Sequence, residues 1–193
     1  MGLTEIAFNF SLLLFALVCF GNFLLFADAL FLQFELKTFL KALGFAALFV
    51  SFLLRFFDHS LINLHVLINA AALYAILFGI AIDYHSKLKF LPILPLAAYF
   101  VFGNHGLLFI ESALIAIVIF QLVYTTKHKD LIPLGVGFVL ISMGEYFYSL
   151  ETKANLSQLA IAGAFPYLFA SLVLLLWLWS YLALRFFHVL KSD

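Results

Sequence analysis

Long apolar runs separated by loops of only a few residues occupy almost the whole chain. They lie near residues 6–27, 38–57, 61–82, 89–103, 106–125, 131–149 and 158–184. A helix that crosses a bilayer needs about 20 mostly apolar residues. The strands of a membrane barrel would alternate in polarity, and these runs do not. The sequence therefore predicts an all-α, polytopic integral membrane protein with seven transmembrane helices in a single membrane domain, residues 1–193.

Composition agrees with a surface that faces lipid. The chain is 66% hydrophobic and only 10% charged, whereas soluble domains carry roughly 25% charged residues. Its net charge is zero and no basic patch is present, so nucleic-acid binding has no support. The lipid bilayer is the first partner that we expect, and the expected location is a membrane crossed several times, of the prokaryotic cytoplasmic type.

Basic residues are distributed unequally between the two sides of the predicted bundle. One side carries Lys37, Lys41, Lys87, Lys89, Lys127, Lys129, Arg185 and Lys191. The other side carries only Arg55 and Lys153. Because Lys and Arg accumulate in cytoplasmic loops, this bias predicts an external N-terminus and a cytoplasmic C-terminus. Ends on opposite sides require an odd number of crossings, in agreement with seven.

The second and sixth runs align without gaps at a constant spacing. Residues that match across 91 positions are Gly44 with Gly135 and Ser51 with Ser142. Both runs begin on the basic side, so a duplication would give two parallel repeats. The alternative is that a composition rich in Leu and Phe produces matches by chance.

A duplication would divide the chain into repeats 1–87 and 104–193, joined by a connector span at 88–103 that contains two prolines. Parallel repeats of this kind occur in transporters. The 3+1+3 layout with an external N-terminus is similar to that of the SWEET-type sugar transporters. The Pro-Gln pair of that family is absent here, so the similarity concerns architecture alone.

Ionisable side chains inside the apolar runs gather near the predicted outer face. On insertion scales such a residue costs about 2.5–3.5 kcal/mol at a helix centre, and it therefore suggests a function. The residues that we predict to form an outward-facing ligand or ion pocket are Arg55, Asp58, His65, Glu111 and Glu145. The repeat places Arg55 almost level with Glu145, so these two could pair. Alternatively, each extends separately to the interface.

Histidines at the same depth raise the question of a metal site. His59, His65 and His105, together with nearby carboxylates, offer the nitrogen and oxygen ligands that zinc takes. No HExxH or HxxxH spacing supports such a site. The alternative is that they are interfacial histidines bonded to loops. The sequence identifies no cofactor, and a metal ion is the one candidate.

Three functions are compatible with the sequence. The first is a protein that is not an enzyme and that binds or passes a small solute or ion, as a transporter or a sensor does. The second is a metal-dependent intramembrane hydrolase, because lipid hydrolases of the ceramidase type resemble this chain in size and number of spans. Their HxxxH motif on a late helix is not matched here. The third is an assembly subunit of a larger membrane complex, or a homo-oligomer.

Overall fold

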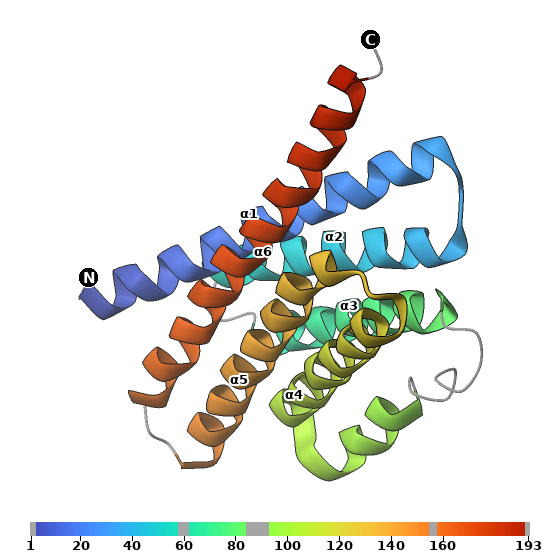
Figure 1. Ribbon diagram of the computed structural model, residues 1–193. Helices are drawn as coiled ribbons and strands as arrows, with labels where there is room; N and C mark the ends of the chain where they lie inside the picture. The colour runs from blue at the N-terminus through green and yellow to red at the C-terminus, as the bar shows by residue number, and fades with distance from the viewer. Residues whose placement is uncertain (1–2, 58–61, 84–92, 155–157, 192–193) are drawn as a thin grey trace.

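The fold consists of long helices joined by short connections (Figure 1). The computed structural model describes residues 3–57, 62–83, 93–154 and 158–191. Its elements are α1 (Leu3–Leu32), α2 (Leu36–Phe57), α3 (Ile62–Asp83), α4 (Ile93–Thr126), the short 3₁₀ helix η3 (Lys129–Leu131), α5 (Ile132–Ala154) and α6 (Gln158–Lys191). No strand occurs in these ranges. Six of the helices are long and apolar enough to cross a membrane, which agrees with an all-α, multi-pass membrane protein.

The runs at 89–103 and 106–125 are not separate helices in the described part of the chain. Residues 93–126 form the single helix α4, which changes direction near its start (Figure 1). Pro95 lies in its first turn, where the missing N–H has no helical partner to lose. The 34 residues of α4 would span about 51 Å at about 1.5 Å per residue, well beyond a hydrocarbon core of about 30 Å. A distinct fourth transmembrane helix is therefore not confirmed.

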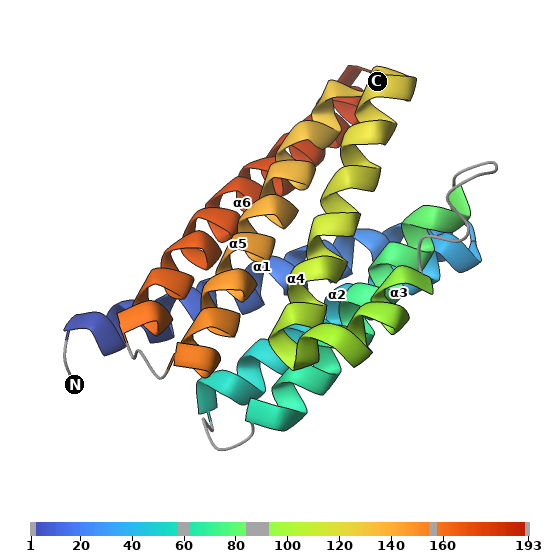
Figure 2. The ribbon, with the colours of Figure 1, turned by 90° about the horizontal axis from the view of Figure 1, so that it is seen from below.

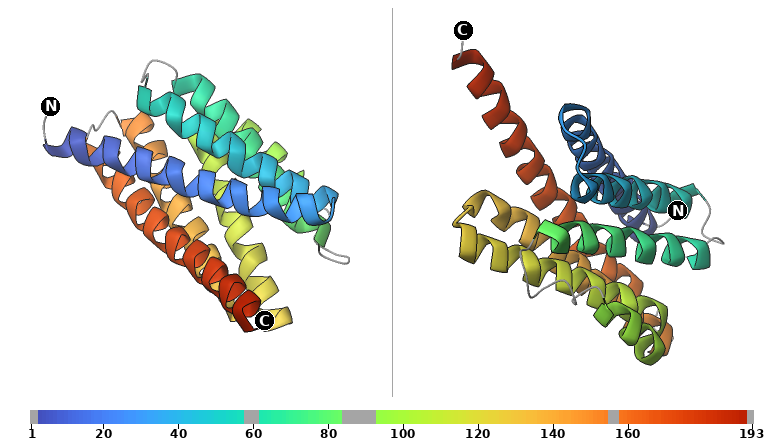
Figure 3. Two further views of the ribbon diagram at one scale, coloured as in Figure 1. Left: turned by 90° about the horizontal axis from the view of Figure 1, so that it is seen from above. Right: turned by 90° about the vertical axis from the view of Figure 1, so that its right-hand side faces the viewer.

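Each half of the chain forms a group of three neighbouring helices. Helix α2 packs between α1 and α3, and α5 packs between α4 and α6. The two groups meet where α1 contacts α6 and where α3 contacts α4. Figures 2 and 3 show the blue-to-green group lying across the yellow-to-red group. Phe15, Phe52, Phe138 and Tyr167 fill the space between the groups and are almost fully buried.

The residues that suggested a repeat make different contacts in the two halves. A Cβ atom on Gly44 would meet the backbone oxygen of Ala72 in α3, whereas one on Gly135 would meet the ring of Phe120 in α4. In a duplication α3 would correspond to α6, and α4 to α1. The matched glycines therefore do not occupy equivalent contacts. In each half the middle helix packs between the other two, but this shared order does not test the duplication. The duplication stays a prediction.

The bundle has two distinguishable ends. Ile80 near the end of α3 and Thr126 at the end of α4 line one shared cavity, so both helices finish at what we call the cavity end. Ser142 donates to the carbonyl oxygen of Phe109 (3.2 Å), which places the start of the apolar part of α4 at the opposite, polar end. Asp83 and Gly106 therefore lie at opposite ends of the bundle.

Candidate functional site

Buried polar side chains from five helices meet at the polar end. We call this group the polar cluster. Each member is at most 7% exposed, and the group consists of Ser51, Arg55, His65, Asn69, Glu111, Glu145, Tyr148 and Tyr167. Ser51 and Arg55 are four residues apart in α2, as His65 and Asn69 are in α3. This spacing puts each pair on one face of its helix, and those two faces point toward each other.

His65 is the centre of the hydrogen-bond network between α2 and α3. Its Nε2 atom lies 3.2 Å from Nη1 of Arg55 and 3.2 Å from Nδ2 of Asn69. A guanidinium can only donate, so Nε2 accepts and carries no proton. The proton is then on Nδ1, which lies 3.0 Å from the backbone oxygen of Ser51 and 2.8 Å from its hydroxyl. This geometry requires a neutral His65 in a single tautomer.

Arg55 is held by aromatic rings as well as by His65. Its guanidinium carbon lies 4.7 Å from the ring centre of Tyr148 and 5.3 Å from that of Phe8. Cation–π contacts of this kind become stronger when water is excluded. They stabilise a charge that is 7% exposed and fix its position beside α5. The guanidinium therefore contacts two aromatic rings as well as His65.

Glu145 accepts a short hydrogen bond from the hydroxyl group of Tyr167 in α6. Both Arg55 and Glu145 act electrostatically on Tyr167. The direct Arg55–Glu145 pair suggested by the sequence is not among the contacts seen for Arg55, which bonds to His65 instead. The rings of Phe15 and Phe52 pack against Tyr167, with centroids 5.2 and 5.4 Å away. These rings keep the carboxylate–phenol pair away from lipid and water.

Glu111 has an unsatisfied oxygen in this environment. Its residue is 2% exposed, and its Oε2 atom has no hydrogen-bond partner among the described residues. The carboxyl group interacts electrostatically with that of Glu145. The Oδ1 atom of Asn69 is also buried without a hydrogen-bond partner among the described residues. Buried acceptors without donors are costly, so these two atoms indicate where a ligand with a positive charge or a donor would fit.

Four of the five pocket residues predicted from the sequence lie in described parts of the chain. Arg55 and His65 are hydrogen-bonded to each other, Glu145 is hydrogen-bonded to Tyr167, and Glu111 lies within electrostatic range of Glu145. Asp58 lies outside the described residues.

Sequence reasoning missed Tyr148 and Tyr167. Each is a tyrosine in an apolar run, and nothing local distinguishes them from the other tyrosines of the chain. Their role follows from which helices are neighbours. Only the packing of α6 against α1 and α5 brings Tyr167 to Glu145.

The predicted metal site is only partly within the described chain. His59 lies outside it, and although His105 is in α4, its side chain is not described. Among the described residues, no three His, Cys, Asp or Glu side chains converge as a metal site requires. Both ring nitrogens of His65 contact protein groups. A metal at this end stays a prediction that depends on His59 and His105.

No protein-family model, curated protein or solved structure matches the chain. The geometry of the polar cluster is therefore the basis of the functional argument.

Proposed function

We propose that the protein is a multi-pass membrane protein that binds or passes a small cation at the polar cluster. The observation that supports this most is the buried carboxyl group of Glu111, which has an oxygen without a hydrogen-bond partner among the described residues and lies within electrostatic range of Glu145. An ionisable residue placed inside a membrane is by default a functional residue. A proton or a small metal cation is the ligand that two buried carboxyl groups within electrostatic range of each other would bind.

The charges of the cluster support a monovalent ligand. Arg55 carries one positive charge, and the donors to His65 keep that ring neutral. Among the described members of the cluster, ionised carboxylates on Glu111 and Glu145 would exceed the positive charge of Arg55 by one, in a medium of low dielectric constant. One proton or one alkali cation makes the cluster neutral. The cluster would then alternate between an empty and an occupied state that differ by one charge.

We propose the predicted topology for this protein, with seven crossings and the polar end outside. It is supported by the positions of Asp83 and Gly106 at opposite ends of the bundle, because six crossings would leave them at the same end. The described residues Lys37, Lys41, Lys127 and Lys129 lie near the cavity end, which supports a cytoplasmic location for that end. In this orientation the polar cluster receives its ligand from the outside.

Passing an ion and sensing it are two forms of this function. Transporter sites usually lie near the membrane midplane, whereas this cluster lies toward one end, which favours a sensor or a gate. The hydrolase and assembly-subunit alternatives remain predictions, and no contact among the described residues favours either of them. Flux and binding measurements on one preparation separate a transporter from a sensor.

The test uses the purified full chain in liposomes. Proton, Na⁺ and K⁺ fluxes are measured with indicator dyes under imposed gradients, and cation binding is measured as a rise in unfolding temperature. A ligand that binds only the folded state at 100 times its Kd stabilises it by about 2.7 kcal/mol. We expect a response to one cation, and we expect Glu111→Gln and Glu145→Gln each to remove it.

A matched control makes the same chemical change elsewhere. Glu35→Gln also replaces a carboxylate by an amide, but Glu35 lies at the cavity end and pairs with Lys37 at 3.2 Å. This variant should keep the wild-type response. Flux in the wild type identifies a transporter, and binding without flux identifies a sensor. If both cluster variants respond as the wild type does, the polar cluster is not the cation site.

A further inference from the structure

A second site candidate lies at the end of the bundle opposite to the polar cluster. A cavity of about 480 Å³ opens there between the helices, and all six long helices contribute to its lining. Its walls are mostly apolar, with Ile76, Ile119, Phe138 and Trp177 among them. Ligand pockets of proteins typically measure about 300–1,000 Å³ and are predominantly apolar with a few polar groups. In size and lining, this cavity resembles such a pocket.

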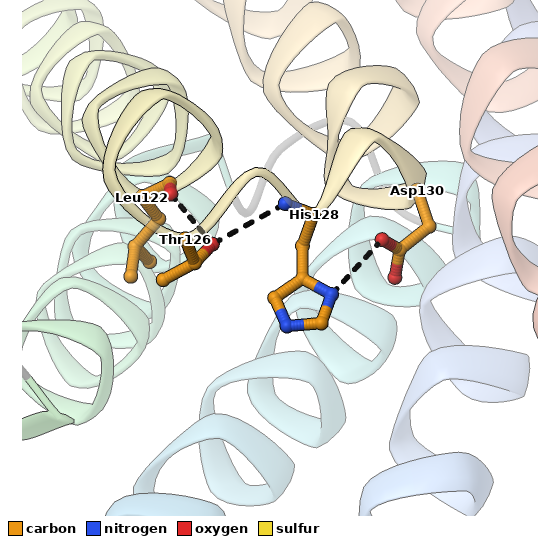
Figure 4. Close-up of polar contacts among 4 residues, drawn as sticks. All are labelled: Leu122, Thr126, His128 and Asp130. Carbon is orange, nitrogen blue, oxygen red and sulfur yellow. Dashed lines mark hydrogen bonds and ion pairs between the residues drawn. The ribbon is translucent and has the colours of Figure 1, made fainter.

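Polar groups of the lining come from the start of α2, from the turn between α4 and α5, and from Trp177 and Tyr181 of α6. Figure 4 shows that turn: the hydroxyl group of Thr126 donates to the carbonyl oxygen of Leu122 (2.7 Å) and accepts from the backbone N–H of His128 (3.4 Å). Lys127 has a φ of 61°, a left-handed conformation that ends α4. The turn thereby places His128 at the rim, where its side chain is 69% exposed.

The lining has one charged side chain among the described residues, that of Lys41, and one imidazole, that of His128. It contains no Asp or Glu from the described part of the chain. Carboxylates do occur nearby, since Asp130 lies 3.6 Å from His128, and Lys41 takes part in an interaction within the protein. No described carboxylate belongs to the cavity walls. A ligand that places an apolar body in the cavity and an anionic group beside Lys41 and His128 would match it in both polarity and charge.

We propose that this cavity binds a long-chain fatty acid, with its carboxylate beside Lys41 and His128 and its alkyl chain between the helices. The chain would lie along the apolar walls formed by Ile119 and Trp177. Lipid tails are as apolar as these walls, so the alkyl chain contributes through its van der Waals fit to the cavity and gains little from leaving the bilayer. The carboxylate supplies selectivity, because hydrogen bonds to charged groups are the strong ones. This site is independent of the polar cluster and of its function.

The first experiment locates the ligand. The full chain in phosphatidylcholine nanodiscs is labelled with a photoreactive analogue of palmitic acid that carries a diazirine on its alkyl chain, and the labelled residues are identified by mass spectrometry. We expect labels on cavity-lining residues of several helices. We expect palmitic acid to displace the probe at a concentration at least about tenfold lower than hexadecanol does, the advantage of a charged over a neutral head group.

Two variants test the geometry. Leu122→Trp fills the cavity from α4 and should reduce specific labelling at least about tenfold, as a loss of about 1.4 kcal/mol would. Lys41→Gln should remove the advantage of palmitic acid over hexadecanol and leave hexadecanol unchanged. The controls are Leu67→Trp, at a position that is 67% exposed on the outer face of α3, and Lys129→Gln, an exposed residue of η3 outside the lining. Both should behave as the wild type.

Three results would overturn the proposal. One is labelling confined to the lipid-facing residues of the helices. Another is equal displacement by palmitic acid and hexadecanol in the wild type. The third is a Leu122→Trp variant that elutes as a single species and is labelled as strongly as the wild type. Labelling and competition in the unaltered protein decide the question even where a variant does not fold.

Discussion

Gly44 is the position where the packing that builds the polar cluster can be tested most directly. It lies in α2, and a Cβ atom there would come within 2.7 Å of the backbone oxygen of Ala72 and would also clash with Ile76. Cβ atoms in proteins essentially never come closer than 3.0 Å to such a neighbouring heavy atom. The side chain of Ile76 can rotate, but the backbone of α3 cannot move away without displacing His65 and Asn69. We therefore predict that Gly44→Ala separates α2 from α3.

The expected magnitude follows from the size of this clash. Overpacking of a well-packed interior costs about 1–3 kcal/mol, and a chain of this length loses about 2–4 °C of unfolding temperature for each kcal/mol. The decrease should be between about 2 and 12 °C. The assay is thermal unfolding in detergent with a thiol-reactive fluorophore, because the one cysteine, Cys19, is fully buried and reacts only when the bundle opens.

Gly135→Ala is the matched control for this experiment. It introduces the same methyl group into α5, but the nearest atoms are ring carbons of Phe120 at 3.0 and 3.1 Å and a methyl carbon of Ile119 at 3.3 Å. At these distances the neighbouring side chains need to move by only a few tenths of an ångström to accept the methyl group. We expect less than half of the decrease seen for Gly44→Ala. Equal unfolding temperatures for Gly44→Ala and the wild type would refute the close approach of α2 and α3.

Three other predictions concern buried polar groups. Arg55→Ala should abolish the cation response in liposomes as Glu145→Gln does; an unchanged response would show that Arg55 does not act in cation binding. Exchanging the two charges (Arg55→Glu with Glu145→Arg) should not restore the response, because a carboxylate at position 55 would face the acceptor Nε2 of His65. Tyr167→Phe removes the donor to Glu145 and should lower stability by about 1 kcal/mol, near the upper values measured for hydrogen bonds inside membranes, which thermal unfolding detects. Asn22→Leu should raise the unfolding temperature, because Asn22 is fully buried with an Oδ1 atom that has no partner among the described residues; a decrease would indicate a polar role for this side chain.

Most of the helices lie where the apolar runs of the sequence predict them. Such runs are a local feature, which the sequence shows directly. Apolar runs of sufficient length form helices because an unpaired backbone amide is costly in lipid. The run at 89–103 is the exception, since Gly103 and Asn104 suggest a loop and instead lie inside α4. Residues such as Gly and Asn have low helix propensity in water. In this helix the continuous backbone hydrogen bonds outweigh that preference.

Part of the polar cluster can be predicted from the sequence. Charged residues in apolar runs are conspicuous, so Arg55, Glu111 and Glu145 can be selected from the order of residues alone. Their depth follows from their position within each run. The contacts between them cannot be predicted in this way. Glu145 bonds to Tyr167 and Arg55 bonds to His65, and both partners are on other helices. The cavity at the other end has no sequence signal at all, since its walls are ordinary apolar residues.

The sequence by itself determined that the chain is a helical membrane protein, at which ends of its helices the ionisable residues lie, and which side carries most of the Lys and Arg. These properties depend on the exchange of single segments between water and lipid, which is local and additive. The tertiary structure alone decided which helices are neighbours, the tautomer of His65, and the cavity beside Lys41. Lipid tails are as apolar as leucine, so helix association depends on detailed packing and hydrogen bonding between helices. The choice of neighbouring helices depends on how particular helix faces fit together, such as Gly44 against Ala72. Hydropathy does not predict this fit.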